Sequence, residues 1–173
     1  GCLIIGLLNP FGNKDLSKLL SDLKLSAIAL ELLPRISRAQ SSDVLSSQAN
    51  IAGYKSVLLA ASELDRYFPM LMTAAGTVQP AKVVVLGGGV AGLQAVATAK
   101  RLGALVFVSD IRPVVKEQVE SLGAKFINLP EIDEKSTESG GYAKTVSTKF
   151  LEEQREILSK HLSEADVAIC TAQ

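Results

Sequence analysis

The amino-acid sequence predicts an α/β fold: a doubly wound parallel sheet, preceded by part of a second α/β domain and a long connecting helix. Short β-branched runs alternate with helical patterns after residue 80, and a glycine-rich turn separates the first run from the first helix. Such alternation produces parallel sheets with right-handed crossovers. We expect a partial first domain over residues 1–42, the connecting helix over residues 43–72, and the main domain, lacking its last strands, over residues 73–173.

The first region contains two short apolar runs on either side of a segment with leucines at helical spacing. Asn9-Pro10 ends the first run and Pro34 stops the second, since proline interrupts regular structure. The opening run is too short to cross a bilayer and lacks a basic leader, so we interpret it as an internal strand. The expected elements are a strand over residues 1–8, a helix over 15–23, a strand over 27–32 and a polar loop over 35–42.

A long helix is expected over residues 43–68, because small and aliphatic side chains recur along one side of this segment. Asp43 or a serine just before it can cap the helix, and Pro69 fits beyond its end. Gly53 is a weak point, since glycine inside a helix is less favourable than alanine.

The main region alternates strand and helix from residue 83 onward. Val83 to Leu86 is a continuous β-branched and aliphatic run, as expected for a strand that is buried on both faces. The expected strands cover residues 83–86, 106–109, 126–129 and 167–170; the expected helices cover 90–102, 114–122 and 145–162; a polar, acidic loop covers 128–141.

The turn after the first of these strands has the sequence GGGVAG over residues 87–92 and matches the pattern G-x-G-x-x-G. The pattern is weak alone, but here it follows a strand and opens a helix, which is the context it requires. Gly87 permits the tight turn, Gly89 lets the backbone approach a pyrophosphate, and Gly92 lets the helix pack closely against the strand. The turn therefore predicts a dinucleotide-binding Rossmann domain, the alternative being a glycine turn that binds nothing.

Val90 and Ala91 open the helix, so their N–H groups and the positive helix end would face the phosphates. Asp110 ends the next strand, about 20 residues downstream, where a carboxylate can accept both hydroxyls of an adenosine ribose. It would also repel a 2′-phosphate, although Arg112 can soften that repulsion. We therefore predict NAD(H) as the cofactor in preference to NADP(H), the alternative for Asp110 being a solvated acid at a strand end.

Composition excludes several other classes of function. The 18 basic and 18 acidic residues balance, so the positive surface of a nucleic-acid binder is not expected. The single histidine, His161, leaves no metal-ligand cluster, and its helix lies away from the carboxyl ends of the strands, so no metal is predicted and no acid–base role is assigned to it. Cys2 and Cys170 lie in strand-like runs and are expected to be reduced core thiols. Hydride transfer between two nicotinamides is compatible with this set, because it needs no proton partner.

Longer motifs resemble the NAD(H)-binding domain of proton-translocating NAD(P) transhydrogenase. The matching stretches are residues 33–54 (LPRISRAQSSDVLSSQANIAGY), 73–98 (TAAGTVQPAKVVVLGGGVAGLQAVAT), 100–103, 116–126 (KEQVESLGAKF) and 140–144 (GGYAK). They extend over nearly the whole chain, and the segment R-I-S-R-A-Q-x-x-D is far more specific than the glycine turn. Ser42 and Gly88 depart from the residues common in the family, which are a larger side chain and valine.

The resemblance implies roles for residues that their types alone leave open. Arg35, Asp43 and Ser46 would orient the nicotinamide carboxamide, and Gln40 would lie where the NADP(H)-binding domain docks. Tyr142 would belong to a loop that closes over bound nucleotide. An Arg, a Gln and an Asp in one loop can fix an amide by paired hydrogen bonds. The alternatives are a solvated loop with a helix cap at Asp43, and an ordinary exposed aromatic at Tyr142.

The resemblance also implies partners and a location. The chain would pass hydride between NAD(H) and NADP(H) on a partner domain, while a membrane proton-channel domain couples that step to proton movement. A homodimer, and attachment to the cytoplasmic face of a bacterial inner membrane or to the mitochondrial matrix side, follow in the same way, without membrane insertion by this segment. Alanine dehydrogenase is the alternative enzyme, and a nucleotide-sensing module without turnover is the alternative of another class.

Overall fold

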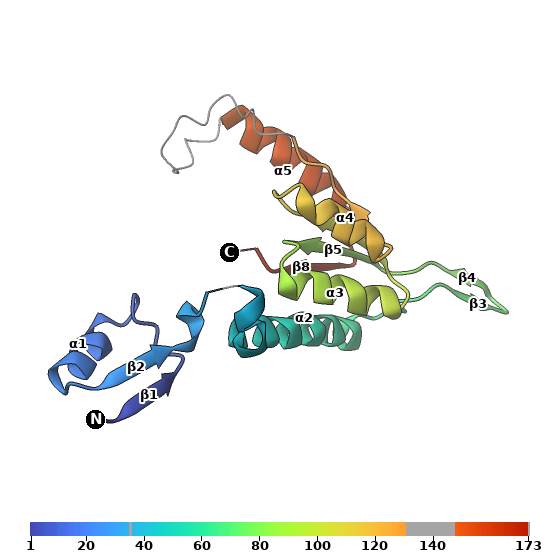
Figure 1. Ribbon diagram of the computed structural model, residues 1–173. Helices are drawn as coiled ribbons and strands as arrows, with labels where there is room; N and C mark the ends of the chain where they lie inside the picture. Colours follow the sequence, from blue (N-terminus) through green and yellow to red (C-terminus); the bar gives the residue numbers. More distant parts are fainter. Residues whose placement is uncertain (35, 131–147, 173) are drawn as a thin grey trace. The chain divides into compact units, whose positions relative to one another are not determined.

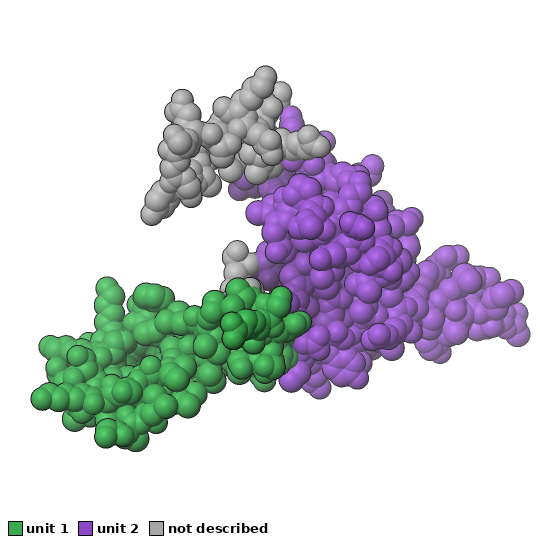
Figure 2. Space-filling model, viewed as in Figure 1, with its two compact units in different colours: residues 1–49 green, residues 50–173 purple. Residues whose placement is uncertain are grey.

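The computed structural model describes residues 1–34, 36–130 and 148–172 (Figure 1). Its contacts divide into two compact units, residues 1–49 and 50–173, which we describe one at a time (Figure 2). Arg35, Tyr142 and most of the loop expected over residues 128–141 lie outside the described residues. Among the helices that are described, none combines the length and the apolar character needed to cross a membrane.

The first unit contains a parallel strand pair joined by a helix. β1 (Leu3–Gly6) pairs with β2 (Ser26–Ala29), and α1 (Lys14–Asp22) connects them. The side chain of Asn13 caps α1 by accepting a hydrogen bond from the N–H of Leu16 at 3.1 Å. All three elements match the expected order.

Two segments of the first unit differ from expectation. The strand expected to continue to residue 32 ends at Ala29, and the 3-10 helix η1 (Leu30–Leu32) follows, with Glu31 accepting hydrogen bonds from the N–H groups of Leu8 and Asn9. The polar segment expected to be a loop forms a second 3-10 helix, η2 (Ser37–Ser42). Short 3-10 turns need no apolar period, which is why the pattern does not reveal them.

The second unit contains a four-stranded parallel sheet in the order β7-β6-β5-β8. The strands are β5 (Lys82–Leu86), β6 (Leu105–Ser109), β7 (Lys125–Phe126) and β8 (Val167–Cys170), and the helices are α3 (Val90–Arg101), α4 (Val114–Ser121) and α5 (Thr148–Ser163). This order confirms the predicted α/β class. Because the chain returns to the other side of β5 to form β8, the carboxyl end of β5 is the switch point of the sheet, where α/β proteins bind ligands.

The two faces of this sheet are covered by different helices. Val83 and Val85 of β5 and Val106 and Val108 of β6 share one face and are fully buried in a cluster with residues of α3 and α4. Phe107 points to the other face, where its ring lies 5.3 Å from the ring of His161 on α5. His161 is thus a packing residue, which agrees with the sequence-based expectation that it has no acid–base role.

The connecting helix α2 (Val44–Glu63) ends five residues before its expected end at residue 68. The chain leaves the helix because Phe68 turns into the core, where it is 5% exposed, and Arg66 pairs with Asp166 at 2.6 Å. Beyond it, β3 (Leu71–Thr73) and β4 (Gly76–Val78) form an antiparallel hairpin that projects from the unit (Figure 1). The sequence pattern does not predict this hairpin, because three-residue strands carry too little alternation to be recognised.

The two cysteines are free and exposed, so the expectation that they are core thiols is wrong. On β8 the exposure alternates, with Ile169 buried and Cys170 exposed. The apolar run of β8 suggests burial on both faces. Among the described residues, however, β8 is an edge strand whose side chains alternate between a covered and an open face.

Candidate nucleotide-binding site

The glycine turn lies where the sequence predicts it, between β5 and α3. Gly87 has a φ of +101°, in the region that side chains rarely adopt, and its N–H donates to the carbonyl oxygen of Ser109 at 2.8 Å. A Cβ at Gly87 would lie 2.7 Å from the backbone nitrogen of Ala172. Only glycine satisfies both the backbone angle and this close approach.

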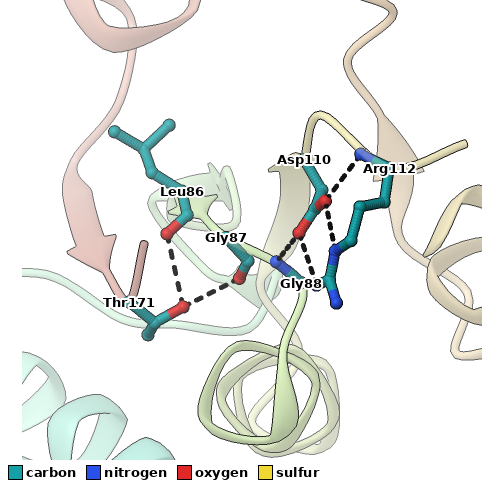
Figure 3. Close-up of polar contacts among 6 residues, drawn as sticks. All are labelled: Leu86, Gly87, Gly88, Asp110, Arg112 and Thr171. Atoms are coloured by element: carbon teal, nitrogen blue, oxygen red, sulfur yellow. Dashed lines mark hydrogen bonds and ion pairs between the residues drawn. The ribbon is translucent and has the colours of Figure 1, made fainter. Parts of the chain in front are cut away.

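Thr171 holds the turn from the other side, immediately after β8. Its hydroxyl lies 2.9 Å from the carbonyl oxygen of Gly87 and 3.3 Å from that of Leu86, and its N–H donates to Leu86 at 2.8 Å (Figure 3). Sequence reasoning misses Thr171, since it lies 84 residues from the turn and matches no motif. The turn is thus fixed by both strands that flank the switch point.

Gly89 and Gly92 differ in what surrounds them. A Cβ at Gly92 would overlap the carbonyl oxygen of Gly87, so the helix approaches the turn as closely as the backbone allows. A Cβ at Gly89 would meet nothing within 4 Å among the described residues. Gly92 is therefore needed for the fold, whereas Gly89 borders open space into which a phosphate group fits.

The start of α3 presents the N–H groups of Val90 and Ala91. Gly89 is the N-cap of α3 and has no side chain that could accept a hydrogen bond from them. Amides of an uncapped first turn carry partial positive charge and favour an anion. The helix start and the open space at Gly89 together form an arrangement suited to a diphosphate.

Asp110 follows β6 and reaches across to the turn. Its side chain is only 6% exposed, and its Oδ2 accepts a hydrogen bond from the N–H of Gly88 at 2.7 Å. Arg112 donates to the same carboxylate from its backbone and from its guanidinium (Figure 3). Asp110 thus lies at the turn, as expected, but it is more enclosed than an acid that simply ends a strand.

The hydrogen bonds from the Arg112 side chain, aided by those from the N–H groups of Arg112 and Gly88, lower the pKa of Asp110 from its ordinary 3.8 to about 2, against the opposing effect of burial. Because the folded-state pKa is depressed, the stabilisation is complete above about pH 4 and is lost as the pH falls toward 2. Arg112→Met is expected to move this loss to higher pH. Unfolding free energies measured between about pH 2 and pH 5 would test this, and identical profiles for the two proteins would contradict it.

Gly88 accounts for one of the departures noted in the sequence. A Cβ at this position would overlap Cγ1 of Val115 on α4 and would lie 3.4 Å from Oδ2 of Asp110. Val115 is 2% exposed and fills the space that a side chain at position 88 would need. In this chain, glycine at position 88 and valine at position 115 are therefore a matched pair.

The residues assigned to the nicotinamide are brought together only in part. Asp43 accepts hydrogen bonds from the N–H of Ser46 at 2.9 Å and from its hydroxyl at 2.7 Å, so it caps α2 as predicted. Gln40 is exposed, and its carbonyl oxygen accepts a hydrogen bond from the N–H of Asp43 at 3.2 Å. Arg35 and Tyr142 are not among the described residues, and all five assignments stay predictions.

The sheet order, the glycine turn at its switch point and the acid on the neighbouring strand define the second unit as a Rossmann-type α/β domain. Comparison with known proteins extends this result. The chain belongs to the alanine dehydrogenase/PNT family, since the model of the family's C-terminal domain matches residues 56–173 and that of its N-terminal domain matches residues 1–52.

Within this family the chain is similar to transhydrogenase alpha subunits. It is 53% identical to an NAD(P) transhydrogenase subunit alpha of Rhodospirillum rubrum, over 99% of this chain and 45% of that protein. The crystal structure of a transhydrogenase from Sinorhizobium meliloti is 47% identical, with a TM-score of 0.82 over 98% of this chain and 44% of that one. An L-alanine dehydrogenase structure is more distant, at 32% identity and a TM-score of 0.57, over 72% of this chain and 36% of that one. The chain thus spans less than half the length of these relatives, and the resemblance found in the sequence is confirmed.

Proposed function

We propose that this chain is the NAD(H)-binding part of a transhydrogenase that exchanges hydride directly with NADP(H) on a partner domain, coupled to proton translocation across a membrane. The observation that carries the proposal is the site at the switch point. There, Asp110 and the amides of Gly88, Val90 and Ala91 converge on one turn. The similarity to transhydrogenase alpha subunits supports the choice of reaction.

The residues of the turn fit a dinucleotide. The first-turn amides of α3 would hold the pyrophosphate beside Gly89, where no side chain intrudes, and Asp110 would accept hydrogen bonds from the adenosine ribose. Its negative charge disfavours a 2′-phosphate, which supports NAD(H) over NADP(H). When bound, the cofactor supplies the carbon that gives or takes the hydride.

The nicotinamide end is assigned to residues outside the glycine turn. Arg35, Asp43 and Ser46 would orient the carboxamide, and Tyr142 would close over the nucleotide. Orientation is what direct hydride transfer requires, because donor and acceptor carbons must be held near contact. We further propose that Gln40 lies where the NADP(H)-binding domain docks, that the protein is a homodimer, and that it attaches to a membrane proton-channel domain on the cytoplasmic face of a bacterial inner membrane or the mitochondrial matrix side.

One assay tests the reaction. The intact protein, mixed with its NADP(H)-binding partner, is expected to reduce an NAD analogue with NADPH as the donor. Alanine-dependent reduction of NAD without a partner would instead identify an alanine dehydrogenase. Binding of NADH with neither activity would identify a nucleotide-sensing module.

Asp110→Ala is expected to weaken NADH binding by about 10- to 100-fold, because hydrogen bonds to a charged group contribute roughly 1.5–3 kcal/mol each. It is also expected to reduce the preference for NADH over NADPH, since the charge that repels a 2′-phosphate is removed. Fluorescence titration with each nucleotide measures both effects. Glu117→Ala, an exposed acid on α4, is the matched control and should change neither. Unchanged affinity and unchanged preference in Asp110→Ala would refute the assignment.

A further inference from the structure

The carboxylate of Asp110 is fully occupied by donors of the described residues. Its Oδ1 accepts from the backbone N–H of Arg112 at 2.8 Å and from Nε of Arg112 at 3.0 Å. Its Oδ2 accepts from the N–H of Gly88 at 2.7 Å and from Nη2 of Arg112 at 2.9 Å. A carboxylate offers about four lone-pair positions. The two hydroxyls of a ribose therefore find no acceptor position open in this arrangement.

The four donors are of two kinds. The N–H groups of Gly88 and Arg112 belong to the backbone, and the fold fixes them beside the carboxylate. The other two belong to the Arg112 guanidinium, on a side chain that is 55% exposed and can move into solvent. Withdrawal of that side chain frees one position on each oxygen and leaves the backbone donors in place.

The freed positions match a ribose. The guanidinium donates one hydrogen bond to each carboxylate oxygen in a planar fork (Figure 3). The neighbouring 2′- and 3′-hydroxyls of a ribose, which carry one hydrogen each, present the same pattern of two adjacent donors. A charge as enclosed as that of Asp110 needs a partner when no ligand is bound, since an unpaired buried charge is costly.

We propose that the Arg112 guanidinium takes the place of the adenosine ribose hydroxyls when the site is empty, and that nucleotide binding exchanges one for the other. This inference rests on the proposed function and adds a competitor within the chain to it. Arg112 is then a positioning residue that lowers the affinity for nucleotide by stabilising the empty site, rather than a group that holds the ligand.

The test compares Arg112→Met with Lys116→Met in the intact protein, by titration with NADH. Both variants remove one positive charge, but Lys116 on α4 contacts Asn128 at 3.3 Å and makes no hydrogen bond to Asp110. Arg112→Met is expected to bind NADH about three- to tenfold more tightly, in line with the small net contribution of exposed ion pairs and the greater one of charged hydrogen bonds. Lys116→Met is expected to bind NADH no more tightly than the unmodified protein.

A second nucleotide makes the test specific. The analogue of NADH with a 2′,3′-dideoxyadenosine cannot replace the guanidinium, so Arg112→Met should not gain affinity for it. Arg112→Lys keeps the charge without the planar fork, and it should show an intermediate gain for NADH; it also decides the matter if thermal melting shows Arg112→Met to be unfolded. Unchanged or weaker NADH binding in the folded variants, or an equal gain for both nucleotides, would overturn the proposal.

The two proposals fail in different ways. If the unmodified protein does not bind NADH, or binds it equally well after Asp110→Ala, the nucleotide-binding function itself is wrong. If NADH binding depends on Asp110 and Arg112→Met shows no gain, only the exchange is wrong.

Discussion

Gly92→Ala is expected to abolish NADH binding and to lower the free energy of unfolding by about 2–3 kcal/mol. The added methyl group would overlap the carbonyl oxygen of Gly87 and would lie 3.0 Å from Oγ1 of Thr171, which anchors the turn. Overpacking of this kind costs about 1–3 kcal/mol, and the oxygen belongs to the backbone and cannot rotate away. The gain in helix propensity from glycine to alanine is about 1 kcal/mol and does not offset it. Urea unfolding and NADH titration measure the two effects.

Gly89→Ala is the matched control for this variant. A Cβ at Gly89 meets nothing within 4 Å among the described residues, so the free energy of unfolding should stay near that of the unmodified protein. NADH binding should still weaken, because the methyl group would occupy the space beside the helix start that the pyrophosphate approaches. Unmodified stability in Gly92→Ala would show that α3 can move away from the turn and would contradict the prediction.

The features that the sequence predicts well are those with local signals. The strands and helices of the second unit alternate in period, and the glycine turn states its own geometry within six residues. Asp110 is predictable because the fold places the end of the next parallel strand beside that turn, so that spacing along the chain becomes proximity in space. The cap at Asp43 is predictable for a similar reason, since its partner Ser46 lies three residues away.

The features that sequence reasoning misses depend on contacts that residue types do not determine. Thr171 anchors the turn from the end of β8, and nothing near position 171 in the sequence marks that role. The fork that Arg112 makes on Asp110 depends on side-chain conformation, which residue types two positions apart do not determine. The sequence suggests instead that Arg112 softens the selectivity for NAD(H), whereas the structure shows it bound to Asp110.

Gly53 shows most clearly how the two kinds of information differ. In the sequence it is a weak point in a long helix, because glycine lowers helix stability. In the structure it is buried where α2 lies beside α3, and a Cβ there would overlap the carbonyl oxygen of Ala91 (Figure 1). The side chains of Asn50 and Gln94 join the same two helices by a hydrogen bond of 3.0 Å. Glycine is thus the residue that lets α2 pack against the first turn of α3.

Gly53→Ala therefore sets two effects against each other. Helix propensity predicts a gain of about 1 kcal/mol, whereas overlap with a backbone oxygen predicts a loss of about 1–3 kcal/mol and a displaced α3. We expect the overlap to prevail, with a net loss of about 1–2 kcal/mol in the free energy of unfolding and weaker NADH binding, since Ala91 contributes one of the amides at the phosphate position.

Ala52→Gly on the exposed side of α2 separates these effects. It should cost about 1 kcal/mol through propensity alone and leave NADH affinity unchanged, because an exposed position does not pack against α3. Urea unfolding and NADH titration of both variants give the comparison. A Gly53→Ala protein that is more stable than the unmodified one, with unchanged NADH affinity, would mean that α2 and α3 can separate without cost to the site, and that helix propensity, not packing, explains the residue at position 53.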